Sequence, residues 1–282
     1  MIIQNNYLYI VATPIGNLAD ITKRALEILE ASDVILCEDT RVTHKLLTRY
    51  SISNKRLVTY NKDLENEKQH EFILSLIKQG NIVSLVSDAG SPCISDPGRA
   101  LVDFLIINGV EIDFLPGACA IINALVLSGF EISQFTFLGF APKTLESRMQ
   151  FFENIASKNG VYVFYDTSPR LLQTLEVALQ VLQNQDIAIC RELTKLNQET
   201  IRTSLKEAFD LALKGEIVVV LNYLNKTAIL DPENRILELK QKELPVKEIA
   251  QIISNEFNIS KNLAYKTTLN IIGKKASESF NF

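Results

Sequence analysis

The fold of this chain is decided by residues 9–41, which read YIVATPIGNLADITKRALEILEASDVILCEDTR. A β-rich run leads into a turn, apolar residues then recur at helical spacing, and a second apolar run ends in CEDTR. This order of strand, helix and strand predicts a β-α-β unit whose helix packs one apolar stripe against a sheet. The turn after the first strand reads TPIGNL and lacks the G-x-G-x-x-G pattern of ordinary dinucleotide-binding units.

The same alternation continues along the chain. Short runs such as LVTY, NIVSLVS and EIDFL predict a largely parallel first sheet. After LPGACA the pattern restarts with a helix and with runs such as FTFLGF, VYVFYD, IAICREL and EIVVVLN, which predicts a second α/β domain. From about residue 231 the strand signals end, and helices are expected around 244–257 and 260–272. We therefore predict an N-terminal α/β domain (1–116), a C-terminal α/β domain (117–228) and a helical extension (229–282).

The composition is that of an ordinary globular protein, with 282 residues, 47% hydrophobic content and a net charge of −4. This balance argues against a uniformly basic nucleic-acid coat but is compatible with a local basic patch. Four scattered cysteines and two histidines cannot form a zinc ribbon or an H-E-x-x-H site. No Lys or Arg precedes Lys23, and Pro116 and Gly117 interrupt the uncharged segment 114–130, so we expect neither export nor a membrane span.

Five turns each follow an apolar run, where open α/β sheets collect ligands. They are TPIGNL (13–18), CEDTR (37–41), SDAGSP (87–92), LPGACA (115–120) and YDTSPR (165–170). A single turn of this kind usually has only a structural role, but several such turns from both halves of the chain could surround one cleft. No two glycines lie two residues apart and no G-K-[ST] loop occurs, which disfavours dinucleotides and nucleoside triphosphates. Asp88 and Ser91 are available to hydrogen-bond an adenosine or a ribose.

Several motifs in a fixed order carry a resemblance to a known family: TPIGNLADIT, CEDTR, LVSDAGSPCISDPG, LPGACA, FYDTSPR, RELTK and ELPVKEIA followed by KNLAYK. From about residue 7 to 272 the chain resembles bacterial small-subunit ribosomal RNA (cytidine-2'-O)-methyltransferases of the tetrapyrrole methylase superfamily. The resemblance implies two α/β domains with S-adenosylmethionine in the cleft between them, and a homodimer. It also implies methylation of a cytidine ribose in the decoding region of the small ribosomal subunit, without a metal and in the cytoplasm.

The resemblance also implies which residues contact the cofactor. In TPIGNL, Pro14 fixes the backbone and Gly16 permits close approach to a ligand that has no phosphate. The other carried-over positions lie in SDAGSPCI, in PGACA and, from the second domain, at strand ends. They are Gly90, Ser91, Pro92, Ile94, Cys119, Ala120, Tyr165, Glu192 and Leu221.

Methyl transfer from a sulfonium is an in-line displacement, so positioning supplies much of the rate gain. A base beside the ribose hydroxyl would help to remove its proton, and the candidates are Glu38, Asp39 and Asp88. We favour Glu38 and Asp39 because CEDTR follows a buried strand. The alternative is that both residues cap the next helix while Arg41 forms a surface ion pair.

Three basic residues are candidates for contacts with the substrate RNA. Arg41 and Arg170 could each bind a phosphate or pair with a nearby carboxylate, and Lys195 of RELTK faces either the substrate or an internal salt-bridge network. The tail 241–282 carries six lysines and four glutamates, with Tyr265 among them. Such a surface either binds RNA or is a solvated helical face without a partner.

Two other functions stay open at this point. A methyltransferase acting on a corrin precursor or another small molecule would use the same fold, because fold does not fix function. A non-catalytic RNA-binding or assembly factor could keep the pocket as a remnant. Such a factor would bind RNA without any dependence on the cofactor.

Overall fold

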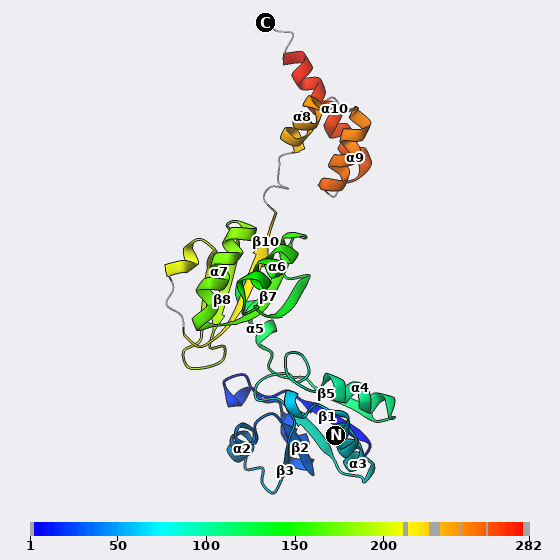
Figure 1. Cartoon of the computed structure of the whole chain (residues 1–282), viewed down its shortest axis with the longest axis vertical. Coiled ribbons are helices and arrows are strands. Elements are labelled where there is room, and N and C mark those ends of the chain that lie inside the picture. The colour runs from blue at the N-terminus through cyan, green and yellow to red at the C-terminus, as the bar shows by residue number, and fades with distance from the viewer. Residues whose placement is uncertain (1–2, 211–213, 226–231, 243, 258, 279–282) are drawn as a thin grey trace. The chain divides into compact units, whose positions relative to one another are not determined.

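A computed structural model describes residues 3–210, 214–225, 232–242, 244–257 and 259–278. Its contacts divide the chain into two compact units. The first comprises Met1–Phe152 and Gly160–Asn222, and the second comprises Glu153–Asn159 and Tyr223–Phe282. The first unit contains two separate β-sheets, each with its own helices (Figure 1).

The first sheet is entirely parallel, with the strand order β3-β2-β4-β1-β5. Its strands are β1 (Tyr7–Val11), β2 (Val34–Cys37), β3 (Arg56–Thr59), β4 (Val83–Val86) and β5 (Glu111–Leu115). Its helices are η1 (Leu18–Asp20), α1 (Lys23–Ala31), α2 (Thr40–Arg49), η2 (Lys62–Leu64), α3 (Glu67–Lys78) and α4 (Arg99–Ile107). Leu8 and Ile10 join the core beneath α3 and α4, whereas Tyr9 and Val11 join the core beneath α1 and α2. Because both faces are covered, the inner strands β1, β2 and β4 are buried along almost their whole length, whereas the edge strands β3 and β5 keep charged and partly exposed residues.

The second sheet is mixed, with the order β6-β7-β10-β8-β9. Its strands are β6 (Phe135–Phe140), β7 (Gly160–Thr167), β8 (Asp186–Arg191), β9 (Glu199–Ser204) and β10 (Glu216–Tyr223). Strand β6 is parallel to β7, but β8 is antiparallel to both β10 and β9. The expected fold class, with two α/β sheets and C-terminal helices, is confirmed, while β9 and the mixed strand direction were not foreseen.

The helices of the second sheet are α5 (Ala120–Ser128), α6 (Leu145–Ala156), α7 (Ser168–Leu182) and η3 (Glu207–Asp210). Helix α5 packs on the face that carries Val163 and Val220. Phe164, the neighbour of Val163 in β7, points to the opposite face and meets the rings of Phe151 and Phe152 from α6. The alternation of side chains along β7 thus supplies two cores.

The second unit contains the helices α8 (Pro232–Gln241), α9 (Val246–Glu256) and α10 (Lys261–Glu278). They share a core of their own, formed by Ile236, Leu239, Ile249, Ala250, Ile253 and Ala264. Helices α9 and α10 fall on the two segments that the sequence predicts, and α8 is additional. Within the described ranges, no helix has both the length and the apolar character that a membrane crossing requires.

Candidate functional site

A cavity of about 370 Å³ lies within the first unit, and both sheets contribute to its walls. The first sheet provides Ile15 after β1, Glu38 after β2, and the segments 88–91 and 94–96 after β4. The second sheet provides residues 165–167 from β7, Leu193 after β8 and residues 216–218 from β10. The start of α5 and Phe140 complete the lining. The cavity therefore lies where the strand ends of both sheets meet, as expected for a ligand site of this fold class.

Six of the expected cofactor positions line this cavity: Gly90, Ser91, Ile94, Cys119, Ala120 and Tyr165. Among the residues that the structure describes, the lining does not include Pro14, Gly16, Pro92, Glu192 or Leu221. Pro14 and Pro92 are buried behind the surface of the two turns. The SDAGSP and LPGACA turns thus contribute to the cavity wall, and of the second-domain positions Tyr165 contributes while Glu192 and Leu221 are absent from the described lining.

Leu221 shows why the second half is harder to predict. It lies deep in the sheet, 1% exposed and paired with Ile187 of β8. Because β10 runs antiparallel to β8, it is the amino end of β10 that lies beside the carboxyl end of β8. Ile217 and Val218 therefore line the cavity in place of Leu221. Strand direction is not encoded in an apolar run itself, so the reversal of β10 could not be predicted from the run EIVVVLN.

The backbone of the SDAGSP segment forms part of the cavity wall. Thr13 and Gly90 form an isolated antiparallel bridge, in which the Thr13 amide donates to the Gly90 carbonyl at 2.8 Å and the reverse bond measures 3.1 Å. Gly90 has a φ of +79°, and a Cβ there would lie 3.1 Å from the Ile15 side chain. A residue with a side chain would be strained in this conformation and would crowd the wall.

Five acidic residues line the cavity. Asp166 and Glu216 of the second sheet are paired with Arg170 and Lys195, and the other three carboxylates, those of Glu38, Asp88 and Asp96, come from the first sheet. Burial is the main cause that raises the pKa of each of these three. Repulsion by Asp88 adds to the rise for Glu38 and Asp96, and repulsion by Asp39 adds to the rise for Asp88. The Asp88 amide faces the Glu38 carboxylate at 3.5 Å. Asp96 is the member that sequence reasoning missed, although it stands in the same LVSDAGSPCISDPG motif as Asp88. This concentration of negative charge suits a ligand with a positive charge.

Asp39 and Arg41 follow the alternative that the sequence left open. Asp39 is the N-cap of α2, where its carboxylate accepts the Arg41 amide at 2.8 Å and pairs with the Arg41 guanidinium. These bonds from Arg41 lower the pKa of Asp39 to about 2. The Asp39 amide in turn donates to the Asp88 carboxylate at 3.1 Å. Asp39 therefore contacts Asp88 rather than the cavity itself.

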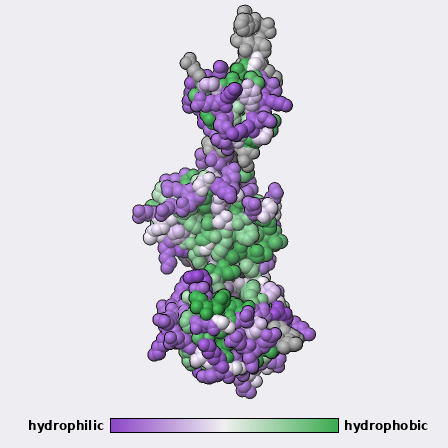
Figure 2. Space-filling view, turned by 90° about the vertical axis from the view of Figure 1, so that its right-hand side faces the viewer, coloured by the Kyte–Doolittle hydropathy of each residue, from purple (hydrophilic) through white to green (hydrophobic). Residues whose placement is uncertain are grey.

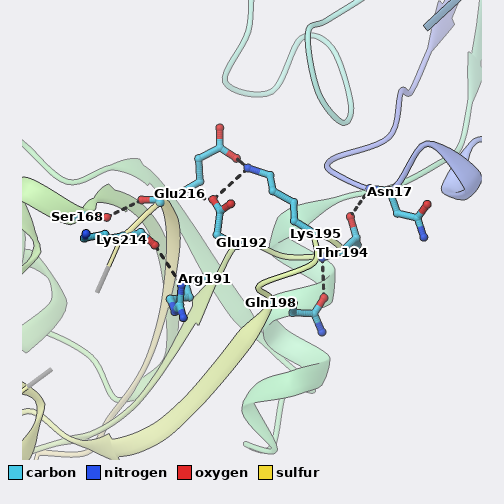
Figure 3. Close-up of polar contacts among 10 residues, drawn as sticks. Asn17, Ser168, Arg191, Glu192, Thr194, Lys195, Gln198, Lys214 and Glu216 are labelled. Carbon is cyan, nitrogen blue, oxygen red and sulfur yellow. Dashed lines mark hydrogen bonds and ion pairs between the residues drawn. The ribbon is translucent and has the colours of Figure 1, made fainter. Parts of the chain in front are cut away.

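The other basic candidates are also paired inside the chain. Arg170 donates to the buried Asp166 carboxylate at 2.9 Å and to the Thr167 hydroxyl at 3.2 Å. Lys195 bridges the carboxylates of Glu192 and Glu216 at 3.1 and 2.8 Å (Figure 3). The amide of Glu216 and the ammonium of Lys195 together lower the pKa of Glu192.

The lining is chemically suited to S-adenosylmethionine. Helix α5 begins at the cavity with Cys119 as its N-cap, and no side-chain cap bonds its first turn, so amide donors there are available for a carboxylate. Apolar groups of Phe140, Tyr165 and Ile217 offer surface for an aromatic base, and the three carboxylates offer charge for a cation. Among the described residues, no cluster of three or more His, Cys, Asp and Glu side chains has the arrangement of a metal site.

Comparison with known proteins gives consistent matches over most of the chain. Residues 7–208 match the family model of the tetrapyrrole (corrin/porphyrin) methylases. A ribosomal RNA small subunit methyltransferase I from Rickettsia prowazekii (strain Madrid E) is 40% identical over 278 residues, covering 97% of this chain and 92% of the relative. The protein of the same name from Escherichia coli O157:H7 is 38% identical over 273 residues, covering 93% and 94%.

Solved structures share the fold at much lower identity. A diphthine synthase superposes with a TM-score of 0.61 at 14% identity, covering 76% of this chain and 89% of its own. A cobalt precorrin-4 methyltransferase superposes with a TM-score of 0.58 at 16% identity, covering 77% and 95%. These two matches confirm the fold class and carry no information about the substrate.

Proposed function

The chain belongs to the tetrapyrrole methylase family and, within it, to the ribosomal RNA small subunit methyltransferase I family, and from that premise we propose its reaction. It transfers the methyl group of S-adenosylmethionine to the ribose 2'-hydroxyl of a cytidine in the decoding region of 16S rRNA. The observation that carries the proposal is the 40% identity to a ribosomal RNA methyltransferase over 97% of the chain. The corrin-precursor enzyme shares 16% identity and only the fold, which weighs against the small-molecule alternative.

In this reaction the protein mainly binds and orients. When bound, S-adenosylmethionine supplies an activated methyl group. The Gly90–Ser91 backbone, the start of α5 and the walls at Tyr165 and Ile217, which line the cavity, would hold it and exclude water. Fixing the ribose oxygen in line with the methyl carbon and the sulfur removes most of the entropic barrier.

The proton of the ribose hydroxyl passes to a carboxylate of the cavity, and we assign this role to Glu38 or Asp88. Both line the cavity, and burial raises the pKa of each, so each is a stronger base than an exposed carboxylate. Asp39 supports them, since its amide holds Asp88 and its side chain is occupied by Arg41. Asp39→Asn should therefore lower the rate less than Glu38→Gln or Asp88→Asn.

Contacts with the RNA come from exposed basic groups. The Arg41 side chain is 86% exposed although it pairs with Asp39, so it can bind a phosphate without losing buried contacts. In the second unit, Lys261 and Lys266 of α10 are exposed, with Tyr265 between them. We propose that these groups bind the phosphate backbone and that Tyr265 stacks on a base.

The proposed assembly is a homodimer in the cytoplasm, where ribosomal subunits are made. Large apolar side chains are exposed on the second-sheet part of the first unit, where Figure 2 shows a broad hydrophobic face. Ile122 and Val126 lie one turn apart on α5 and are 50% and 67% exposed, and Phe135 and Phe140 of β6 are 43% and 58% exposed. A second copy of the chain covering such a face would remove this surface from water.

Transfer of labelled methyl groups tests the proposal and separates its alternatives. Purified protein and labelled S-adenosylmethionine are incubated with small subunits that lack the modification, with free 16S rRNA, and with a precorrin mixture. Label in the rRNA is the expected result. Label in the precorrins alone would favour the small-molecule enzyme, and RNA binding without cofactor binding or transfer would favour the assembly factor. Gly90→Val is the control variant, because its side chain intrudes on the cavity wall at a backbone conformation that disfavours it.

A further inference from the structure

The loop between β8 and β9 has an unusual backbone. Glu192 and Thr194 both adopt the left-handed region, with φ angles of 50° and 63°. Residues with a Cβ are disfavoured there and persist only when surrounding contacts hold them. The two flanking strands are tied by Arg191, which donates to Glu199 at 2.6 Å. Within the loop, the Thr194 amide donates to the Gln198 side chain at 2.6 Å (Figure 3).

One side of this loop is fixed to the amino end of β10. The Glu192 carboxylate accepts the Glu216 amide at 3.0 Å and the Lys195 ammonium at 3.1 Å, and Lys195 also reaches the Glu216 carboxylate at 2.8 Å (Figure 3). Gly215 has a φ of +103°, and a Cβ there would overlap the Glu192 carboxylate. The loop is therefore held against the second sheet by charge and by close packing.

The other side of the loop contacts the first half of the unit. The Thr194 hydroxyl accepts the backbone amide of Asn17 at 2.9 Å (Figure 3). A Cβ on Gly16 would lie 2.6 Å from the Lys195 side chain, 2.7 Å from the Thr194 hydroxyl and 2.8 Å from the Leu193 carbonyl. Gly16 is thus needed for the close approach of this loop, whereas the sequence interpretation gave that space to the cofactor.

This contact lies just outside the ligand space. Ile15 and Leu193, the neighbours of Gly16 and Thr194, both line the cavity, and so does Glu216. Within the described lining, Gly16, Thr194 and Lys195 do not appear. The bond from Asn17 to Thr194 therefore joins two walls of the cavity, one from each sheet, without touching what the cavity holds.

We propose that Thr194 is a positioning residue: its bond to the Asn17 amide holds the two walls together and so sets how long S-adenosylmethionine or its product stays bound. This inference rests on the proposed function. Opening the contact separates Ile15 from Leu193 and gives the ligand a way out. The intact Asn17–Thr194 bond does not act on the reacting atoms themselves, because Thr194 is not among the described residues that line the cavity.

Thr194→Val removes the acceptor and keeps the shape of the side chain. We expect S-adenosylhomocysteine to dissociate about fivefold faster, which corresponds to the loss of one ordinary hydrogen bond. The rate at saturating S-adenosylmethionine should change less than about twofold, so that KM rises and kcat does not. Thr194→Ser keeps the hydroxyl and should behave as the wild type.

The matched control is Thr203→Val. Thr203 lies in β9 of the same sheet and loses one hydroxyl bond of similar exposure, to Glu207 at 3.2 Å, away from the cavity. Dissociation of S-adenosylhomocysteine from the immobilised full-length chain is measured by surface plasmon resonance. Deuterium uptake of the peptide 12–20 is measured with and without S-adenosylhomocysteine, and thermal unfolding reports on stability.

The expected result is faster dissociation and faster exchange at Asn17 in Thr194→Val alone. Equal dissociation in Thr194→Val, Thr203→Val and the wild type would overturn the proposal. Gly16→Ala is a second variant, because its Cβ pushes the loop away while the Thr194 hydroxyl remains. It should also speed up dissociation, and unchanged dissociation in a folded Gly16→Ala protein would count against the proposal. If the wild type fails to bind S-adenosylhomocysteine at all, the proposed function fails first, and the two failures are thus distinguished.

Discussion

The FYDTSPR motif supports a quantitative prediction, because it contains a buried carboxylate held by a single cation. The Asp166 side chain is fully buried. One of its oxygens accepts Arg170 at 2.9 Å and the Thr167 amide at 2.7 Å, and the other has no hydrogen-bond partner within the described part of the chain. Arg170 is therefore the group that balances this charge.

Replacing Arg170 by alanine should destabilise the first unit by about 3 kcal/mol. Removal of one partner from a buried ion pair typically costs about 3–5 kcal/mol, because the remaining charge stays buried without compensation. We take the lower end because the Arg170 side chain is 22% exposed and water can enter the space that it leaves. For a unit of this size the loss corresponds to a fall in Tm of roughly 6–12 °C.

Thermal and urea unfolding of the protein without RNA provide the assay, with Asp166→Asn and the double variant Arg170→Ala, Asp166→Asn as partners. The double variant should be more stable than Arg170→Ala alone, because it no longer buries an unpaired charge. The reasoning would be refuted if Arg170→Ala kept the wild-type Tm and lost affinity for rRNA. Arg170 would then be an RNA contact, as the sequence equally allowed.

Three further predictions concern charge and surface. Lowering the pH should weaken binding of S-adenosylmethionine, because burial raises the pKa of Glu38 above 4.5 and that of Asp88 and Asp96 above 3.8, and their protonation removes negative charge from the cavity. The stability of the free protein follows the opposite sign, since the contribution of these carboxyl groups is complete below those ordinary values and is lost as the pH rises through the raised ones. Calorimetric titrations with S-adenosylmethionine, over the pH range in which these carboxyl groups become protonated, measure the change in cofactor affinity. Urea unfolding over the same pH range measures the change in stability. Reversing the charge of Lys261 and Lys266 together should weaken rRNA binding and reduce its salt dependence by about one unit of slope for each lost phosphate contact, with cofactor affinity unchanged. Val126→Glu should shift the sedimentation coefficient from that of a dimer to that of a monomer, because it places a charge in the apolar face.

Each of these predictions has a contrary outcome. Cofactor affinity that is independent of pH would mean that the three carboxylates do not face the cation. Equal loss of rRNA and cofactor affinity in the lysine variant would mean that α10 has a structural role. An unchanged sedimentation coefficient for Val126→Glu would place the dimer contact on another surface.

The sequence predicts well where the chemistry is local. The apolar runs beginning at YLYIV and DVILC become β1 and β2, and the turns after them supply Ile15 and Glu38 to the cavity. Such runs can be recognised as strands from their own residues, since burial on both faces leaves a nearly continuous apolar pattern. The SDAGSP turn is likewise visible because its glycine and proline mark a fixed backbone.

The sequence predicts poorly where several strands must be placed relative to one another. The direction of β10 decides whether Ile217 or Leu221 faces the cavity, and that direction follows from pairing with β8 across the sheet. The role of Gly16 depends on a loop almost 180 residues further along the chain, where Thr194 stands. Contacts of such sequence separation leave no periodicity in either segment.

Methylation of a cytidine ribose in the small subunit can be measured directly by mass spectrometry. Small subunits that lack the modification are incubated with the protein and S-adenosylmethionine carrying a deuterated methyl group, and the 16S rRNA is digested to nucleosides for mass spectrometry. We expect a single labelled product, 2'-O-methylcytidine with the deuterated methyl on the ribose. Label on a base, or on no nucleoside although the protein binds S-adenosylmethionine, would contradict it.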